Sequence, residues 1–196
     1  MSIDLTALPI RAATPMPYRA GGVQASALGG AILQVDRMGD RWSFQFETPM
    51  MQLEPDGRQW QALFDQAERA GAIVRVVQPG FVAIAPGAPI VAADTALGRA
   101  IPLSGLTPAY PIRAGQWLSI ISGGRRYLDK AVAEVVADSA GLATVTIKNL
   151  IRAPLSAGDV VELAVPKIEG VISGDFNAPW PSNRLSSFSF TVTEVR

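Results

Sequence analysis

The chain has 196 residues with 17 basic and 17 acidic side chains, so it has no net field that would attract nucleic acid or an anionic membrane. It contains no cysteine and no histidine. This composition excludes disulfides, thiol nucleophiles, Ser-His-Asp and Cys-His catalysis and zincin-type metal sites. An enzyme of this sequence would have to use Asp, Glu, Lys, Tyr or Ser alone. We expect no metal, no cofactor and no recognition of nucleic-acid sequence.

The N-terminal segment, residues 1–30, is rich in Pro, Ala and Gly and shows no sustained hydrophobic period. We predict an extended arm with one edge strand around Ile3 to Leu8, which either stays a loose terminus or pairs with a neighbouring subunit. The segment lacks the basic start and apolar core of a signal peptide, and the chain has no apolar run of about eighteen residues. We therefore expect synthesis in the host cytoplasm and no membrane insertion.

Residues 31–100 are predicted to form a β lobe with one packed helix. An apolar run at 32–35 leads to a turn at 38–40, and Trp42, Phe44 and Phe46 then alternate with polar residues. This pattern is typical of a hairpin with one buried face and one wet face.

The helix of this lobe is predicted at about residues 56–70. Asp56 is a candidate N-cap with Gln59 three residues later, as in a capping box, and Gly71 is a candidate left-handed C-cap. Between these ends, Trp60, Phe64 and Ala67 recur at helical spacing, as do other apolar residues. Such a stripe indicates a core face more often than a ligand site.

After the helix the pattern changes to strands. Short β-branched runs at 72–77, 81–85 and 89–94 are separated by Pro-Gly pairs, so we predict three strands joined by tight turns. The Gly- and Pro-containing stretch at 96–112 is interpreted as a long connection between lobes, in which Ile101 and Leu103 are the only paired positions.

Residues 101–170 are predicted to form a small β-barrel-like lobe. The phrase "AGQWLSI" at 114–120 returns as "AGDVVEL" at 157–163, and each time a glycine turn precedes an apolar alternation. We interpret the two phrases as turns that open strands of the same lobe, with further strands, including "AVAEVVAD" at 131–138, between them.

The last segment, residues 171–196, is predicted to be an exposed loop followed by a closing strand in which Phe188, Phe190, Val192 and Val195 alternate with polar residues. The predicted fold class is therefore mainly β, with barrel- or sandwich-like lobes and one α-helix, in one compact structural unit.

Few motifs in the sequence indicate a catalytic or ligand-binding site. Gly123-Gly124 followed by Arg125 and Arg126 suits an anion site, but suits the tip of a hairpin better. The aspartates are scattered beside turn residues, where they cap their own backbone, and no acidic cluster indicates a metal cage. Trp180, in a Pro-rich loop, either offers an exposed aromatic ring to a sugar or protein partner or folds back on its own domain. The candidate interface residues are Tyr18, Arg19, Arg125, Arg126 and Trp180.

The order of features resembles a family, the distal tail and tail-tip hub proteins of long-tailed, siphovirus-like bacteriophages and gene-transfer particles. The resemblance covers most of residues 23–166. Its anchors are the Asp-Arg-x-Gly-x-Arg-Trp segment at 36–42, the Ala-Gly-Gln strand start at 114–116, and the Ala-Asp-x-x-Gly-x-Ala-Thr-Val segment at 137–145 with the Leu-Ile-Arg that follows it.

The resemblance implies a homo-oligomeric ring, hexameric in this family, at the distal end of the tail tube. Its partners would be copies of itself, the tail tube protein and the tip or baseplate proteins, and its location would be the virion tail. Only about thirty residues follow Pro166, too few for the separate sugar-binding domain of some members. A structural virion protein without enzymatic activity is therefore the expected function. A small β-rich recognition module for a glycan or protein, and a carboxylate-based hydrolase, are the alternatives.

Overall fold

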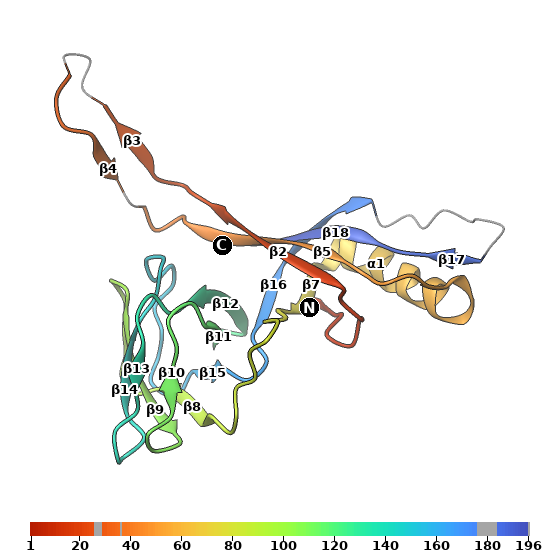
Figure 1. The fold of residues 1–196 in the computed structure, drawn as a ribbon. Helices are drawn as coiled ribbons and strands as arrows, with labels where there is room; N and C mark the ends of the chain where they lie inside the picture. The colour runs from red at the N-terminus through yellow and green to blue at the C-terminus, as the bar shows by residue number, and fades with distance from the viewer. Residues whose placement is uncertain (26–28, 36, 176–183, 196) are drawn as a thin grey trace.

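Two six-stranded sheets, one helix and a projecting hairpin make up the fold (Figure 1). The computed structural model describes residues 1–25, 29–35, 37–175 and 184–195. The predicted class is confirmed, since strands are the predominant regular structure of the described residues and these contain one α-helix.

The first sheet has the strand order β1-β7-β16-β18-β5-β2. These strands are β1 (Ile3–Asp4), β7 (Ala72–Arg75), β16 (Lys167–Asp175), β18 (Ser189–Glu194), β5 (Arg41–Glu47) and β2 (Ala12–Tyr18). Only β1 and β7 pair in parallel. The residues 1–30, expected as an arm, thus contribute β1 and β2 to the sheet. As predicted, Trp42, Phe44 and Phe46 face the core.

The helix α1 (Arg58–Ala70) packs on the core face of this sheet, where the ring of Phe64 lies 5.0 Å from those of Phe188 and Phe190. As predicted, the helix ends at Gly71, which has a positive φ of 84°, but its ψ of 165° differs from the left-handed helical conformation expected for this cap. The prediction of a capping box formed by Asp56 and Gln59 is wrong, because no side chain caps the N-terminus of the helix. A π-helical turn, η1 (Leu53–Gly57), precedes α1, and its carbonyl groups already accept the N–H of Arg58.

The second sheet is a half-barrel with the order β12-β11-β15-β8-β9-β14. Its strands are β12 (Arg125–Lys130), β11 (Trp117–Ser122), β15 (Val160–Glu162), β8 (Gly87–Val91), β9 (Ala100–Leu106) and β14 (Ala143–Thr146), and beside it β10 (Pro111–Ile112) pairs with β13 (Val135–Val136). The two similar phrases open β11 and β15, which are antiparallel neighbours, with Ile120 opposite Val161. Gly115 and Gly158, at the turns, both have positive φ.

Three strand predictions in this region are wrong. Residues 81–85 form no strand, since no neighbour pairs with them, and the side chains of Val82 and Ile84 are 78% and 80% exposed. The predicted connection at 96–112 instead contains β9, a central strand that pairs with both β8 and β14. Within 131–138, only the two residues of β13 are paired as a strand.

The hairpin predicted between residues 32 and 46 does not form, because its two strands pair with other strands and not with each other. β4 (Leu33–Val35) pairs with β3 (Gly22–Gln24), while β5 pairs with β2 and β18. The result is one long two-stranded ribbon: one side runs from β2 into β3, and the other runs from β4 into β5. Asp40 lies where the ribbon bends between its two strand pairs. The carboxylate of Asp40 accepts the backbone N–H groups of Ala20 and Gly21 at 2.7 and 3.3 Å. The outer part, β3 and β4, projects from the body as what we call the hairpin arm (Figure 1).

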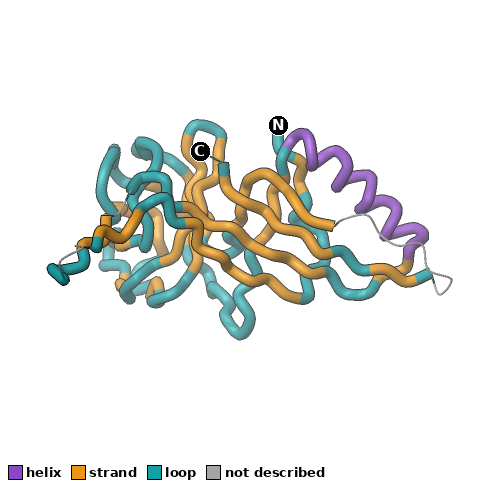
Figure 2. Tube along the Cα trace, turned by 90° about the horizontal axis from the view of Figure 1, so that it is seen from above, coloured by secondary structure: helices purple, strands orange, loops and turns teal. Residues whose placement is uncertain are grey.

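The second sheet, together with the β10 and β13 pair and the loops between these strands, forms what we call the second lobe. The helix and the second lobe lie at opposite ends of the first sheet (Figure 2). Both pack on the same face, because Phe64 of α1 contacts Phe190 and Trp117 of β11 contacts Phe44, each ring pair at 5.0 Å. β12 also packs against β5 and β16. Beyond the helix, β17 (Leu185–Ser186) pairs with β6 (Met51–Gln52).

Candidate assembly surface

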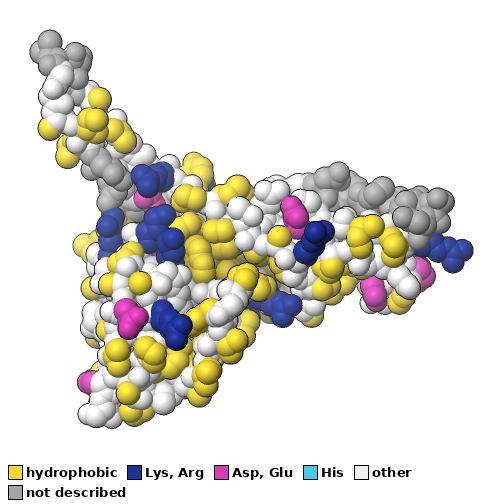
Figure 3. Space-filling view, viewed as in Figure 1, with side chains coloured by type: hydrophobic (Ala, Val, Ile, Leu, Met, Phe, Trp, Pro, Cys, Tyr) yellow, Lys and Arg dark blue, Asp and Glu magenta, His cyan; other side chains and the backbone are white. Residues whose placement is uncertain are grey.

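The hairpin arm exposes apolar side chains. Val23, Ile32 and Leu33 are 64%, 71% and 59% exposed. The register pairs Leu33 with Gln24, the neighbour of Val23, so Val23 and Leu33 lie on opposite faces of the two-stranded ribbon. Figure 3 shows hydrophobic side chains along the projection. Large apolar side chains on both faces of a projecting element suit a protein contact better than water.

A cavity of about 380 Å³ lies at the foot of the hairpin arm, and we call it the foot cavity. It is lined by Pro17, Tyr18, Arg19, Asp40, Arg99, Lys148 and Asn149. The structure thus brings the candidate residues Tyr18 and Arg19 together with cations of the second lobe. Sequence reasoning missed Arg99 and Lys148, because residues so far from the arm in sequence give no signal that they will face it.

Cationic and aromatic side chains are stacked beside this cavity. The guanidinium group of Arg41 lies 4.3 Å from the centre of the Tyr18 ring. The Lys148 amine lies 4.2 Å from the Trp42 ring centre, and the Lys130 amine lies 5.3 Å from the same ring. Burial, and then the positive charges of Lys130 and Arg19, lower the pKa of Lys148, while the carboxylates of Asp129 and Asp40 act in the opposite direction. The foot cavity thus brings three basic side chains together with Asp40.

Two buried carboxylates lie in the joint between the sheets, and Asp129 is the first. It accepts the indole N–H of Trp42 at 3.1 Å and the backbone N–H groups of Lys130 and Asn149 at 2.8 and 3.0 Å. Burial raises the pKa of Asp129, although these donors act in the opposite direction. The carboxylate connects β5 of the first sheet to β12 and the segment after β14.

Glu194 is the second buried carboxylate and is only 2% exposed. It accepts the backbone N–H groups of Trp42 and Leu128 at 2.8 and 2.7 Å and the Arg152 guanidinium at 2.7 Å. Burial raises the pKa of Glu194, opposed first by Arg152. Sequence reasoning expected Val195 at this inward position, but Val195 is 50% exposed. Glu194 and its donors join the two sheets.

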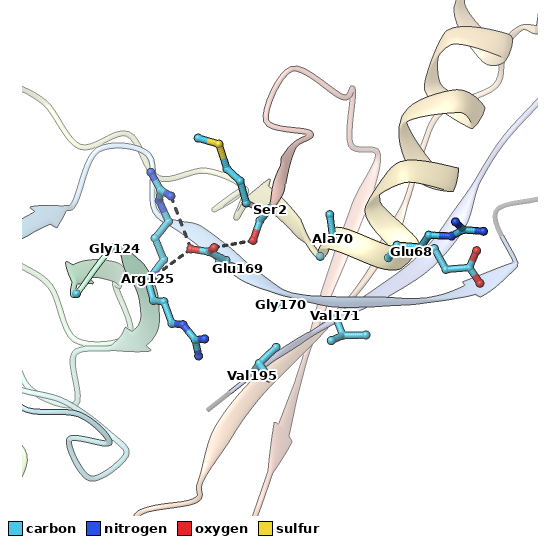
Figure 4. Close-up of a pocket in the computed structure, with 14 residues that line it drawn as sticks. Ser2, Glu68, Ala70, Gly124, Arg125, Glu169, Gly170, Val171 and Val195 are labelled. Carbon is cyan, nitrogen blue, oxygen red and sulfur yellow. Dashed lines mark hydrogen bonds and ion pairs between the residues drawn. The ribbon is translucent and has the colours of Figure 1, made fainter.

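The predicted hairpin tip at Gly123-Gly124 joins β11 and β12, and both glycines have positive φ. Arg125 is exposed there, whereas Arg126 is partly buried and lies 3.3 Å from Glu162 and 3.8 Å from Glu169. Glu169 also accepts the hydroxyl of Ser2 at 2.7 Å. The tip glycines, the two arginines, Glu169 and Ser2 all line a groove of about 430 Å³ (Figure 4). Arg126 thus stabilises the joint.

The other candidate residue, Trp180, lies outside the described residues. Within the described ranges, no group of three or more acidic side chains is placed to hold a metal ion. No helix in the same ranges is long and apolar enough to span a membrane. No model of a known protein family matches the chain, and no curated protein sequence matches it. The candidate site is therefore defined by its geometry alone, as an apolar arm whose foot carries basic side chains beside the joint between the two sheets.

Proposed function

We propose that this chain is a structural subunit that assembles into a ring of about six copies at the distal end of a phage tail tube and holds the tip proteins there. The resemblance in sequence motifs suggests this function. The observation that supports it best is the hairpin arm, which carries exposed apolar residues on both of its faces.

The arm supports association because its apolar side chains gain free energy when a neighbour covers them. Full burial of one Val, Ile or Leu side chain contributes about 1.5–3 kcal/mol. Val23, Ile32 and Leu33 are each more than half exposed, so each retains much of that gain for a contact with another subunit. In a closed ring every copy both gives and receives one arm, which doubles the contacts that hold each subunit.

The free edge of the first sheet is less suited to association than the arm. β2 is its edge strand and contains Pro15 and Pro17, which have no N–H group to donate to a further strand. Prolines on an edge strand oppose uncontrolled sheet extension. Association through the arm, and not through this edge, is the arrangement that the sequence of β2 favours.

The test is the native mass of the purified chain over a range of concentrations, with negative-stain images of any large species. The wild-type chain is expected to form rings. A double variant, Val23→Asp with Leu33→Asp, should be monomeric, because it places charges on both faces of the arm. The matched control is Leu97→Asp, at a side chain of the second lobe that is 72% exposed, and it should keep the ring.

A wild-type chain that stays monomeric at every concentration would argue against the ring and favour the recognition module. Rings that survive the double variant would show that the arm does not hold the subunits together. The comparison requires that the variants are folded, which an unchanged circular dichroism spectrum would show.

A further inference from the structure

The segment at residues 81–85, between β7 and β8, has the character of a strand but no strand beside it. It is an apolar run that is rich in strand-forming residues. Val82 and Ile84 are 78% and 80% exposed, whereas Ala83 between them is partly buried, as in a strand with one packed face. The backbone groups of residues 82–84 make no hydrogen bond to any other described residue. These groups are therefore available to a neighbouring strand.

Both ends of this segment are fixed to the body of the protein. At one end, the backbone N–H of Phe81 donates to the carbonyl group of Gln78 at 3.1 Å, and the Gln78 side chain accepts a backbone N–H of β11 at 2.9 Å. At the other end, the hydroxyl of Thr107 donates to the carbonyl group of Ala85 at 2.7 Å. Residues 82–84 are held between these two anchors, so they lose little conformational entropy when a strand pairs with them.

The hairpin arm has the complementary property, because it is a ribbon of only two strands. Among the described strands, β3 and β4 pair with each other alone, so each has one free edge. Two strands by themselves are marginally stable in water, and a third strand stabilises them. The arm points away from the segment at 81–85 of its own chain (Figure 1). If this segment is the third strand, it therefore belongs to a second copy.

The arm and the segment also match in charge, since both are neutral. The two longest stretches of the sequence without a charged side chain are residues 20–35, which contain the arm, and residues 76–93, which contain the segment. Charged residues make up 17% of the chain, so these two stretches differ from the rest of it. A contact between two neutral surfaces removes no charged group from water, and that removal is what opposes association at charged surfaces.

We propose that the hairpin arm of a second copy of this chain adds as a strand to residues 81–85. Main-chain hydrogen bonds to residues 82–84 hold the arm, and Val82 and Ile84 pack on its apolar side chains. The contact is head-to-tail, because it joins two different surfaces, and its repetition closes a ring or extends a filament. This inference rests on the proposed association through the arm and names the surface that receives the arm.

Introduced thiols test which surfaces meet, because the chain contains no cysteine. Val23→Cys and Leu33→Cys mark the two strands of the arm, and Ile84→Cys marks the segment. Each arm variant is co-expressed with the segment variant and treated with a short bismaleimide linker. We expect cross-linked pairs in at least one of the two mixtures. The matched control is Leu97→Cys, at a 72% exposed side chain of the second lobe, which should not link to either arm variant.

Each variant treated alone should give no cross-link, because a head-to-tail contact places the introduced thiol against a wild-type surface. A cross-link in one variant alone would indicate a symmetric contact and overturn the proposal. Amide hydrogen exchange then separates strand addition from an apolar contact. Residues 82–84 should exchange slowly in the assembled wild type, and this protection should be lost in the monomeric chain with Val23→Asp and Leu33→Asp.

The outcomes for the ring and for the arm contact are distinguishable. A wild-type ring that gives no cross-link between arm and segment, or that exchanges fast at residues 82–84, would overturn this proposal and retain the ring. Cross-links and slow exchange in an assembly that is not a ring would support the strand addition and contradict the ring. A wild type that stays monomeric and forms no cross-link would overturn both.

Discussion

Substitution of Glu194 by Ala removes the acceptor at the centre of the joint between the sheets. The carboxylate accepts Trp42 N–H in the first sheet, and Leu128 N–H and the Arg152 guanidinium in the second lobe. Glu194 is 2% exposed, and the side chain of Arg152 is 8% exposed, so little water can reach the donors that lose their acceptor. The variant thus leaves two backbone donors and one charge unpaired.

The size of the loss follows from the burial of these groups. A buried donor without an acceptor costs about 1–3 kcal/mol, and removal of one partner of a buried ion pair costs about 3–5 kcal/mol. The two figures describe the same event and do not add. Since burial already disfavours the carboxylate and raises its pKa, its removal returns part of the cost. We expect the free energy of unfolding to fall by about 3 kcal/mol, a large share of the 5–15 kcal/mol typical of a domain.

Urea unfolding, followed by tryptophan fluorescence and by circular dichroism, measures this loss. Glu194→Gln keeps one oxygen acceptor and should lose less than Glu194→Ala. Glu134→Ala, at an exposed carboxylate of the second lobe, is the control and should change stability by less than about 0.5 kcal/mol. A loss below about 1 kcal/mol in Glu194→Ala, with an unchanged dependence on urea, would refute the argument that this carboxylate joins the sheets.

Two further predictions concern stability. Because burial raises the pKa of Glu194 above its ordinary 4.5, the folded state binds more protons than the unfolded state just above that pH, so the stability of the wild type relative to Glu194→Gln should fall as pH rises from about 4 towards neutrality. Urea titrations at several pH values check this, and a rising difference would contradict it. Gly170→Ala should lower stability by about 1–3 kcal/mol or more, because a Cβ there would lie 2.0 Å from the carbonyl oxygen of Thr193. Gly22→Ala, where no atom lies within 4 Å, is the control in thermal unfolding, and equal losses would contradict the steric argument.

The buried faces of single strands were predictable because their period is local. Alternation placed Phe44, Phe46, Phe190 and Val192 in the core, and all four are buried. The same alternation continues to the end of the strand and places residue 194, not residue 195, on the core face. The apolar character of Val195 suggested that Val195 is buried, whereas strict alternation places Glu194 on the buried face. The structure follows the alternation, so the side-chain period of the strand decides burial here and the residue type does not. A buried carboxylate with three donors is the exception that composition cannot reveal.

Pairing partners were not predictable, because they depend on distant parts of the chain. Nothing near residues 33–35 indicates that they pair with 22–24 and not with the strand that follows them. The foot cavity has the same origin, since Arg19 comes from the segment between β2 and β3 while Arg99 and Lys148 come from the second lobe. A sequence pattern specifies which side of a strand is apolar, but not which neighbour that strand meets.

A neutral composition does not exclude local groups of basic side chains, because the fold decides which charged residues come together. In the joint, Asp129 and Glu194 are buried with their donors, while Lys148 and Arg19 lie at the cavity outside. Net charge governs the field beyond a Debye length of about 8–10 Å, where the chain is neutral. Within that length the cations at the foot act on whatever touches them. Neutrality therefore argues against long-range attraction of nucleic acid by the chain as a whole.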